Sequence, residues 1–565
     1  MIIEKIEEAK MKNTTTTTIA LALLAAVCLA QTPPTIQWQR SLGGSDRDYA
    51  GSIQQTSDGG FIVAGYSLSN DGDVSGHHGT PGDSTDYWIV KLDSTGEIDW
   101  QRSLGGSYDD LACSVQQTSD GGFIVAGYSY SNDGDVSGHH GTPGDSADYW
   151  VVKLNSAGSI EWQKSLGGSD WDYAYSIQQT TDGGFIVAGW SESNDGDVSG
   201  NHGYADYWVV KLDSTGEIDW QKCLGGSDWD EAYSVQQTSD TGFIVAGYSR
   251  SNDDDVSGNH GSADYWVVKL DSAGNIEWQR SLGGSDEDYA RSIQQTSDSG
   301  FIVAGRSESN DGDVSGNHGS DDYWVVKLNS AGNIVWQTSL GGSINDEPYS
   351  IHQITDGGYI VAGWSNSNDG DVSGHHGLPG YYNDYWVVKL NSMGNLVWQK
   401  CLGGTSYEQS YSIQQTADGG FIVAGLSDSN DGDVSGNHGF YDYWVVKLSP
   451  DTSVGIVENA LPEQFAINVF PNPFNSSVAI TAPAGAEIEI YDITGSRVWG
   501  LGSSFSPTQT NGADEAGSPY TLNPIPCAGG GGRAFIWTPD DNTPSGVYLV
   551  RLTGTNASTK VIYMK

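Results

Sequence analysis

Hydrophobic residues recur along this chain in short runs that follow one another in a fixed order. In the third unit of the pattern the runs cover residues 160–166, 176–180, 185–189 and 207–212. Each run is rich in β-branched and aromatic residues and is bounded by Gly, Asp, Ser or Asn, which is typical of β-strands. The repeats contain no apolar stripe at helical spacing. The pattern therefore predicts four antiparallel strands in each unit.

Seven near-copies of this unit lie between residues 38 and 448. Each copy opens on a Trp-Gln step, at Trp38, Trp100, Trp162, Trp220, Trp278, Trp336 and Trp398. A repeated four-stranded unit is typical of a β-propeller, which has about four to eight blades. A β-solenoid is the structural alternative, but its coils are usually shorter and it leaves both ends to be capped. We therefore expect an all-β chain with a seven-bladed propeller over residues 31–448.

The two ends of the repeat region each lack a partner strand. The strand around Trp38 has none before it, and the last copy ends at Leu448 without the strand that follows in the other copies. Unpaired strand edges invite aggregation, so pairing the two ends would protect both. The sequence predicts a ring that is closed by the Trp38 strand against residues 443–448.

Alternate connections of an up-and-down blade emerge on opposite faces of the ring. The turns at residues 57–60 and 93–96 should therefore share one face, and the loops at residues 43–48 and 70–76 should share the other. Long loops gathered on one face of a rigid scaffold are where binding is expected. We predict binding on the face that carries the long loops.

The long loop carries the motif with the clearest chemistry. The run Asp71-Gly-Asp73-Val-Ser75-Gly places oxygen side chains at alternate positions, as many calcium loops do. Asp86, which precedes the Tyr-Trp strand, could supply a further ligand, because calcium takes about six to eight oxygens. The alternative is a turn whose carboxylates accept backbone N–H bonds. The seven candidate calcium sets are Asp71, Asp73, Ser75 and Asp86; Asp133, Asp135, Ser137 and Asp148; Asp195, Asp197, Ser199 and Asp206; Asp253, Asp255, Ser257 and Asp264; Asp311, Asp313, Ser315 and Asp322; Asp369, Asp371, Ser373 and Asp384; and Asp431, Asp433, Ser435 and Asp442.

A histidine follows each motif in the sequence Gly-x-His-Gly, from His78 to His438. A ring of seven histidines suggests a metal, but no Cys or second recurring His stands beside each one, as zinc would require. We therefore expect these histidines to stabilise the turn. No Ser-His-Asp set or other catalytic motif is recognised in the repeats.

The chain has 25 basic and 72 acidic residues and a net charge of −47. Because nucleic-acid binding needs basic patches, this balance argues against nucleic acid as a partner. It suits a soluble surface protein or one that holds cations, and calcium is the one cofactor that the sequence suggests. The five cysteines form no disulfide framework, since Cys223 and Cys401 share a repeat position three blades apart.

Residues 1–30 have the features of a secretory signal peptide, with Met11 as the expected start. Lys12 and a Thr run precede an apolar stretch over residues 19–30, followed by a polar segment. That stretch is too short for a membrane span of about twenty residues, and no later stretch is long enough. We expect an exported protein without a transmembrane segment.

After residue 448 the sequence changes character. A linker at residues 449–464 precedes a region that contains Phe-Pro-Asn-Pro from residue 470, Ile-Tyr-Asp-Ile-Thr-Gly from residue 490 and Ser-Gly-Val-Tyr-Leu-Val from residue 545. Residues 465–565 resemble the C-terminal sorting domain of the type IX (Por) secretion system, an immunoglobulin-like sandwich. They depart from that pattern in a Gly/Pro-rich insertion over residues 500–533. At Trp537-Thr538-Pro539-Asp540 they also lack the Gly that usually follows a Trp-Asp step in that family.

The resemblance implies that the type IX secretion machinery is a partner, and that the protein is released or held at the outer-membrane cell surface. The residues that match the sorting signal are Pro471, Asn472, Pro473, Gly546, Tyr548, Lys560 and Lys565. A less specific resemblance links residues 207–220 to quinoprotein propellers; it supports the propeller but implies no quinone cofactor.

Two classes of function remain. The near-identity of the blades favours a secreted or cell-surface binding or adhesion protein without catalysis, whose ligand is a glycan or a protein. The alternative is a propeller-type extracellular enzyme, such as a hydrolase, a lyase or a quinoprotein. One loop position before the recurrent acid varies among the copies, and large aromatic residues there suit ligand contact. The candidates are Trp171, Trp229 and Tyr407.

Overall fold

The computed structural model describes residues 32–451 without a break. The described residues that follow are 468–470, 478–483, 488–492, 497–500, 525–526, 532–537, 539, 544–552 and 558–563. The chain divides into two compact units, Met1–Thr452 and Ser453–Lys565. The expected signal peptide, with Met11, lies outside the described residues. The described residues contain strands and no α-helix, which confirms the all-β fold class.

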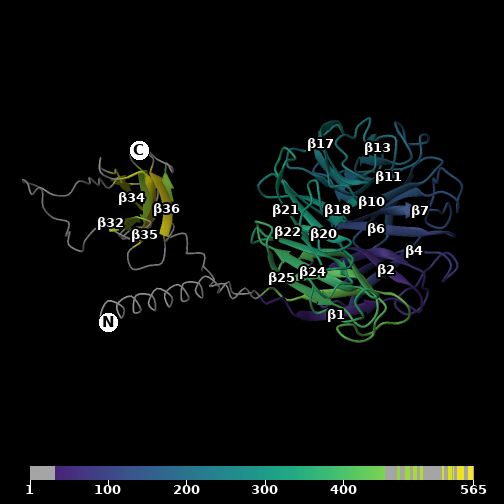
Figure 1. Cartoon of the computed structure of the whole chain (residues 1–565). Coiled ribbons are helices and arrows are strands. Elements are labelled where there is room, and N and C mark those ends of the chain that lie inside the picture. Colours follow the sequence, from purple (N-terminus) through teal and green to yellow (C-terminus); the bar gives the residue numbers. More distant parts are fainter. Residues whose placement is uncertain are drawn as a thin grey trace, which may run out of the picture. The chain divides into compact units, whose positions relative to one another are not determined.

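The first unit contains seven four-stranded antiparallel sheets, arranged as the blades of a propeller (Figure 1). The innermost strands are β2 (Asp48–Gln55), β6 (Asp110–Gln117), β10 (Asp172–Gln179), β14 (Asp230–Gln237), β18 (Asp288–Gln295), β22 (Asp346–Gln353) and β26 (Glu408–Gln415). The second strands are β3 (Phe61–Ser67), β7 (Phe123–Ser129), β11 (Phe185–Ser191), β15 (Phe243–Ser249), β19 (Phe301–Ser307), β23 (Tyr359–Ser365) and β27 (Phe421–Ser427). The third strands are β4 (Asp86–Leu92), β8 (Asp148–Leu154), β12 (Asp206–Leu212), β16 (Asp264–Leu270), β20 (Asp322–Leu328), β24 (Asp384–Leu390) and β28 (Asp442–Leu448). The outermost strands are β5 (Ile98–Leu104), β9 (Ile160–Leu166), β13 (Ile218–Leu224), β17 (Ile276–Leu282), β21 (Ile334–Leu340), β25 (Leu396–Leu402) and β1 (Ile36–Leu42).

The ring is closed by its first strand. β1 pairs antiparallel with β28, with Trp38 opposite Lys447 and Leu42 opposite Tyr443. The sheet order β1-β28-β27-β26 completes the last blade. The predicted closure is therefore confirmed. Each blade takes its outermost strand from the start of the next sequence copy, so sequence repeat and blade are offset by one strand.

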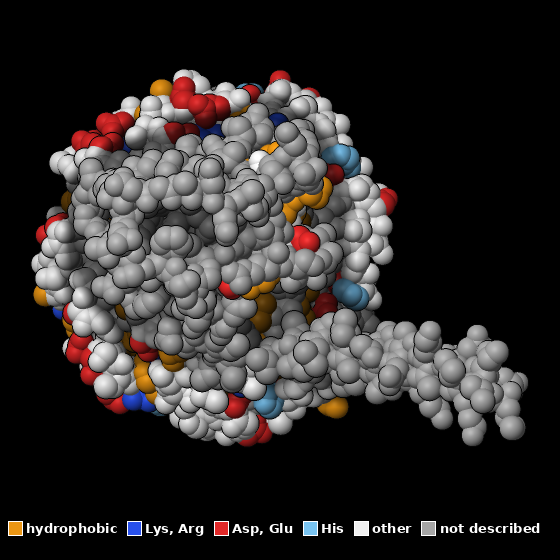
Figure 2. All heavy atoms as spheres, turned by 90° about the vertical axis from the view of Figure 1, so that its left-hand side faces the viewer, with side chains coloured by type: hydrophobic (Ala, Val, Ile, Leu, Met, Phe, Trp, Pro, Cys, Tyr) orange, Lys and Arg blue, Asp and Glu red, His pale blue; other side chains and the backbone are white. Residues whose placement is uncertain are grey.

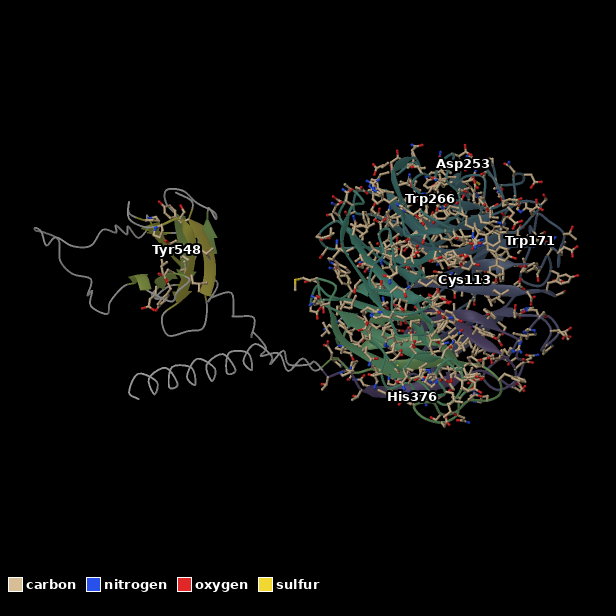
Figure 3. All side chains as sticks on the ribbon, in the orientation of Figure 1. Cys113, Trp171, Asp253, Trp266, His376 and Tyr548 are labelled. Atoms are coloured by element: carbon tan, nitrogen blue, oxygen red, sulfur yellow. The ribbon has the colours of Figure 1, made fainter. Side chains whose placement is uncertain are left out.

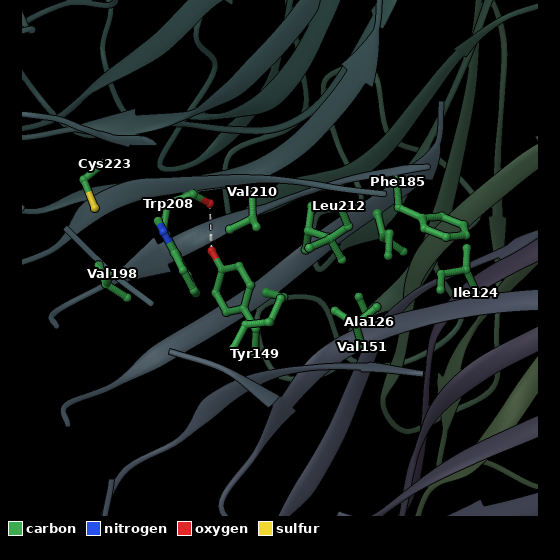
Figure 4. Packing of buried hydrophobic residues seen from close by; sticks show 14 residues of the cluster. Ile124, Ala126, Tyr149, Val151, Phe185, Val198, Trp208, Val210, Leu212 and Cys223 are labelled. Carbon is green, nitrogen blue, oxygen red and sulfur yellow. Dashed lines mark hydrogen bonds between the residues drawn. The ribbon is translucent and has the colours of Figure 1, made fainter. Parts of the chain in front are cut away.

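The hydrophobic core lies between neighbouring blades, because the second and third strands of each blade are buried on both faces. Figure 4 shows one of these interfaces, in which Tyr149 packs against Trp208 of the next blade with ring centroids 4.5 Å apart. The Tyr149 hydroxyl donates to the Trp208 carbonyl oxygen at 2.9 Å. The same Tyr-to-Trp bond joins all seven neighbouring pairs. Each buried phenol thus has its acceptor while its ring fills the interface.

The loops at residues 43–48 and 70–76 lie together on one face of the ring, as predicted. The backbone N–H of Ser45 donates to Asp71 Oδ1 at 2.7 Å, and that of Asp46 donates to Ser69 Oγ at 3.0 Å. These bonds hold the two loops of a blade against each other. The long-loop face, as we call it below, is formed by these two loops and their equivalents.

The described strands of the second unit form two four-stranded antiparallel sheets, in the orders β29-β30-β34-β33 and β32-β31-β35-β36. Two antiparallel sheets of this size are what an immunoglobulin-like sandwich contains. The strands are β29 (Asn468–Phe470), β30 (Val478–Pro483), β31 (Ile488–Asp492), β32 (Arg497–Gly500), β33 (Ile525–Pro526), β34 (Gly532–Trp537), β35 (Gly546–Leu552) and β36 (Ser558–Tyr563).

Candidate functional site: an aromatic pocket on the propeller axis

The predicted calcium ligands lie on the long-loop face, but each is hydrogen-bonded to its own partner within the protein. Asp71 Oδ1 accepts the backbone N–H of Ser45, and Ser75 Oγ accepts a bond from Gln101 Nε2 at 2.5 Å. The equivalent residues of the other copies repeat these contacts. Within the described residues, no group of three or more His, Cys, Asp or Glu side chains is arranged to hold a metal ion. The contacts match the turn alternative, and the calcium site stays a prediction.

The remaining ligands of each set belong to a histidine clasp between blades. His78 Nδ1 lies 2.8 Å from Asp86 Oδ2, and His78 Nε2 lies 3.3 Å from Asp135 Oδ2 of the next blade. Asp135 is the equivalent of Asp73, and the second carboxylate of the loop lies within 4 Å of the histidine of the preceding blade at three further interfaces. The hydrogen bond to the aspartate of its own blade raises the pKa of His140. The histidines therefore stabilise the turn and also link the blades.

Two buried carboxylates meet at each blade interface, and we call this pair the acid joint. One oxygen of Asp110 and one of Asp86 lie 2.5 Å and 2.8 Å from the position that a Cβ at Gly105 would take. Asp110 Oδ2 accepts the N–H of Gly106 at 2.7 Å and the hydroxyl of Ser131 at 3.1 Å. The Oδ1 atoms of Asp86 and Asp110 have no hydrogen-bond partner among the described residues. Burial, with a contribution from Asp86, raises the pKa of Asp110 to about 8, so this joint retains a proton near neutral pH.

The three aromatic residues singled out in the loops also lie on the long-loop face. Trp171 is 43% exposed and its Nε1 donates to the Asp145 carbonyl oxygen at 3.0 Å (Figure 3). The Trp229 ring stacks on Tyr204 of the neighbouring long loop, with centroids 6.2 Å apart. Tyr407 is 36% exposed. The Trp229 ring also contacts Trp190, with centroids 6.3 Å apart.

Every innermost strand carries a β-bulge at the same position. In β2 the register shifts between Ala50 and Ser52, which leaves Gly51 outside the regular pairing, and the other six strands shift at the equivalent residue. Bulges re-aim a side chain and are over-represented next to active sites. The seven bulged residues line one pocket of about 300 Å³ on the axis and are Gly51, Cys113, Tyr175, Tyr233, Arg291, Tyr349 and Tyr411.

The pocket is asymmetric because the copies differ at the bulge. Five consecutive blades contribute large side chains, such as Tyr349 and Tyr411, whose ring centroids are 4.9 Å apart. The other two blades contribute Gly51 and Cys113, which leaves open space beside them; Figure 3 shows Cys113 inside the ring. The lining residues lie in the first half of strands that follow the Gly-Gly-Ser loops, so the pocket lies toward the long-loop face.

Most of the lining is aromatic, with a few polar groups directed into it. Tyr66 and Tyr128 line the space, and neither hydroxyl donates to a group within the described chain. Arg291 is the one basic side chain among the described lining residues. Its blade lies across the ring from the blades of Gly51 and Cys113, and its guanidinium lies between the rings of Tyr233 and Tyr349. This combination of apolar walls and few polar groups is typical of a small-molecule site.

A belt of glutamine side chains holds the innermost strands in place next to the pocket. Gln54 Oε1 accepts the backbone N–H of Gln117 in the next blade at 2.6 Å, and five further interfaces repeat this bond. In the sixth blade His352 replaces the glutamine, and burial lowers its pKa to about 4, so it is neutral. The belt lines a second cavity of about 200 Å³. It fixes the strands that carry the bulged residues.

The bulged residues of the pocket lie outside the loop motifs that the sequence singled out. Its ring residues stand inside the innermost strands, between Ala50 and Ser52 in the first copy. Comparing the copies position by position would have drawn attention to this position, because it varies from Gly to Arg while the Ser that follows is constant. On the visible rim of the propeller in Figure 2, acidic side chains are more widespread than basic ones, which makes a cation on the axis more distinctive.

Three of the residues expected in the sorting signal are described. Gly546 begins β35, and Tyr548 is buried in that strand with its hydroxyl donating to the Pro544 carbonyl oxygen at 2.6 Å. Lys560 lies in β36, opposite Leu549. The others lie outside the described residues and are Pro471, Asn472, Pro473 and Lys565.

Residues 468–513 match the family of secretion system C-terminal sorting domains. This match confirms the expected type IX sorting domain. The chain is therefore a secreted or cell-surface protein, and its C-terminal domain interacts with the type IX secretion machinery.

A curated protein, the regulatory protein FlaEY of Caulobacter vibrioides, is 24% identical to this chain over 340 residues. The similar segment covers 54% of this chain and 34% of that protein. The chain thus spans about a third of the length of this relative. Separately, the described residues include no helix of the length and hydropathy that crossing a membrane requires.

Proposed function

We propose that this chain is a non-catalytic binding protein whose propeller recognises a carbohydrate in the axial pocket after export. The pocket itself carries the proposal, because seven bulges aim the variable residues at one space. Tyrosine rings offer flat apolar faces to a sugar ring, and the free hydroxyls of Tyr66 and Tyr128 suit its hydroxyl groups. A surface-held protein with such a site would serve adhesion, and a released one would capture soluble glycans.

The chemistry of the pocket favours binding over the enzymatic alternative. A thiol acts as a nucleophile only as the thiolate, and burial raises the pKa of Cys113 to about 12. Glu231 accepts hydroxyl bonds from Tyr233 at 2.6 Å and from Tyr248 at 2.5 Å, which holds it away from the role of a free base. A hydrolase or lyase would need an acid and a base that face a substrate in this space.

The test is a glycan array probed with the full chain, in calcium and in chelator. We expect binding by the wild type and its loss in Cys113→Tyr, which fills the open side with the residue that four other blades carry. The matched control is Cys401→Ser, since five other copies have Ser at that position, and it should bind as the wild type does. Hydrolysis or cleavage of an arrayed glycan would support the enzymatic alternative instead.

A protein ligand is the second candidate, and the exposed Trp171 favours it, because tryptophans on loops are frequent interface anchors. Absence of glycan binding, together with capture of a protein that Trp171→Ala abolishes, would replace the carbohydrate proposal.

Export has its own test in the native host. Deleting residues 466–565 should leave the propeller in the periplasm, because the sorting domain is gone. Recovery of the truncated chain in the medium or at the surface would contradict the role assigned to this domain.

A further inference from the structure

One residue of the axial ring differs in charge from the other six. The bulge carries tyrosine in four blades, glycine or cysteine in two, and arginine only at Arg291. The chain has 25 basic residues against 72 acidic ones, so a cation inside a pocket stands out. An aromatic lining would be complete with a fifth tyrosine, and size alone therefore does not account for Arg291.

Arg291 is also unpaired where its neighbours are paired. Arg250 lies 3.2 Å from Glu287, and Arg306 lies 2.5 Å from Asp321. No ion pair joins Arg291 to any carboxylate of the described residues, and its Nε is buried without a hydrogen-bond partner.

Tyrosine rings flank the guanidinium instead. Its carbon lies 4.4 Å from the ring centroid of Tyr233 and 5.3 Å from that of Tyr349. Glu347 acts on the charge from farther away, but its carboxylate accepts the Tyr349 hydroxyl at 3.2 Å. The rings attract the cation through their faces, the Tyr233 hydroxyl also interacts with the guanidinium, and the Nε–H donor has no partner among the described residues.

We propose that the axial pocket binds a sugar residue that carries an anionic group, a carboxylate or a sulfate ester, with Arg291 as its anchor. This inference rests on the proposed carbohydrate binding. Guanidinium pairs with carboxylate or sulfate through parallel N–H bonds, and such charge-assisted bonds are strong in a site with little water. The remaining hydroxyls of the sugar reach Tyr66 and Tyr128, and its ring lies beside Gly51 and Cys113.

The experiment measures binding of the full chain to three oligosaccharides of equal length by titration calorimetry: an oligouronate, a sulfated oligosaccharide and a neutral one. We expect the preferred anionic ligand to bind at least roughly tenfold more tightly than the neutral one. The stronger of the two anionic arms identifies the carboxylate or the sulfate as the recognised group.

Three variants locate the effect. Arg291→Tyr installs the residue of four other blades and should lose roughly tenfold or more in affinity for the anionic ligand, while the neutral ligand changes less than about twofold. Arg291→Lys keeps the positive charge but loses the paired N–H donors of the guanidinium. It should retain part of the preference for the anionic ligand. Arg280→Thr removes an arginine of an outermost strand, as in the copy with Thr338, and should change neither affinity.

The outcomes separate this inference from the proposed function. If neutral and anionic ligands bind equally and Arg291→Tyr changes neither affinity, the anionic anchor is wrong and carbohydrate binding stands. If none of the three binds and the glycan array is also blank, the proposed function fails as well. If Arg291→Tyr lowers the Tm, Arg291→Lys is compared with the wild type instead. An unchanged preference for the anionic ligand in Arg291→Lys would contradict recognition through paired guanidinium N–H donors.

Discussion

Two rings of residues in the propeller, three positions apart in the same strands, follow opposite rules. The ring that begins at Asp48 is acidic in every blade, whereas the ring that begins at Gly51 varies from Gly to Arg. The acidic ring lies between blades, and its seven side chains have equivalent partners. The variable ring meets its own copies on the axis, where seven large side chains would compete for one space. In this repeat, constancy marks the acid joints and variation marks the pocket.

The largest expected effect separates the two rings within one strand. Asp110→Ala should lower the free energy of unfolding by roughly 3 kcal/mol or more, because Gly106 N–H and the Ser131 hydroxyl lose a buried acceptor. Cys113→Tyr should change it by less than about 1 kcal/mol, since other blades hold tyrosine there. Urea unfolding measures both. Asp110→Glu should fall between them, as Glu408 occupies this position in the last blade.

If Asp110→Ala is neutral and Cys113→Tyr destabilises, the assignment of joint and pocket is reversed.

Much of the fold could be predicted because the same local pattern occurs seven times. Closure followed from two unpaired ends, and the pairing of β1 with β28 confirms it. The sequence pattern did not show which strand of each blade is innermost. It therefore offered no reason to single out the side chains near the axis. A one-residue bulge re-aims Gly51 and its equivalents, and bulges have no clear signature in an alternating pattern.

The candidate pocket lies toward the face on which the sequence predicted binding, but it is lined by other residues. The loop motifs favoured abundant carboxylates such as Asp71 as calcium ligands. In the structure, Asp71 Oδ1 accepts a backbone N–H bond instead. The histidine role followed correctly from the lack of a second metal ligand, and His78 bonds to Asp86 accordingly. The partner of His78 in the next blade, Asp135, could not be foreseen, because contacts between blades depend on the closed ring.

The acid joints should make the propeller more stable at mildly acidic than at alkaline pH. Burial raises the pKa of Asp48, Asp172 and Asp346 from 3.8 to about 7. A carboxyl with a higher pKa in the folded chain stabilises it fully below the unfolded pKa, and this contribution is lost as pH rises through the folded pKa. The raised pKa of His140 acts in the same direction. Between about pH 5.5 and about pH 8.5 the Tm should fall by roughly 5 °C or more by scanning calorimetry.

A pair of variants distinguishes the acid joints from general charge repulsion, which also grows with pH. Asp110→Asn imitates the protonated acid, removes one titration and should make the fall of Tm with pH shallower. Asp93→Asn removes one charge from an exposed turn, where the hydroxyl bond from Thr95 keeps the pKa low. It should leave the fall unchanged. Equal effects of the two variants would assign the pH dependence to net charge.

A smaller effect is expected from the aromatic residues on the loops. Trp171→Ala combined with Trp229→Ala should leave the Tm nearly unchanged and weaken glycan binding by less than roughly tenfold, because the two rings lie outside the axial pocket. Cys113→Tyr should abolish binding in the same assay. The reverse result, abolition in the double variant and retention in Cys113→Tyr, would move the site from the axis to the loops.

Calcium should have the smallest effect, and it tests whether the constant carboxylates of the long loops bind a ligand. Asp71 Oδ1 already accepts the N–H of Ser45, and the carboxylate of Asp135 faces His78, so an ion would have to displace existing contacts. We expect the Tm in millimolar calcium and in chelator to agree within about 1 °C. One site at a hundredfold excess over its Kd would add about 2.7 kcal/mol, and seven sites would shift the Tm far more. A rise in calcium that Asp71→Asn reduces would establish the predicted calcium loop, because asparagine can still accept the turn bond but brings no charge. In that case a constant position would bind a ligand, and constancy among the copies would no longer separate joint from site.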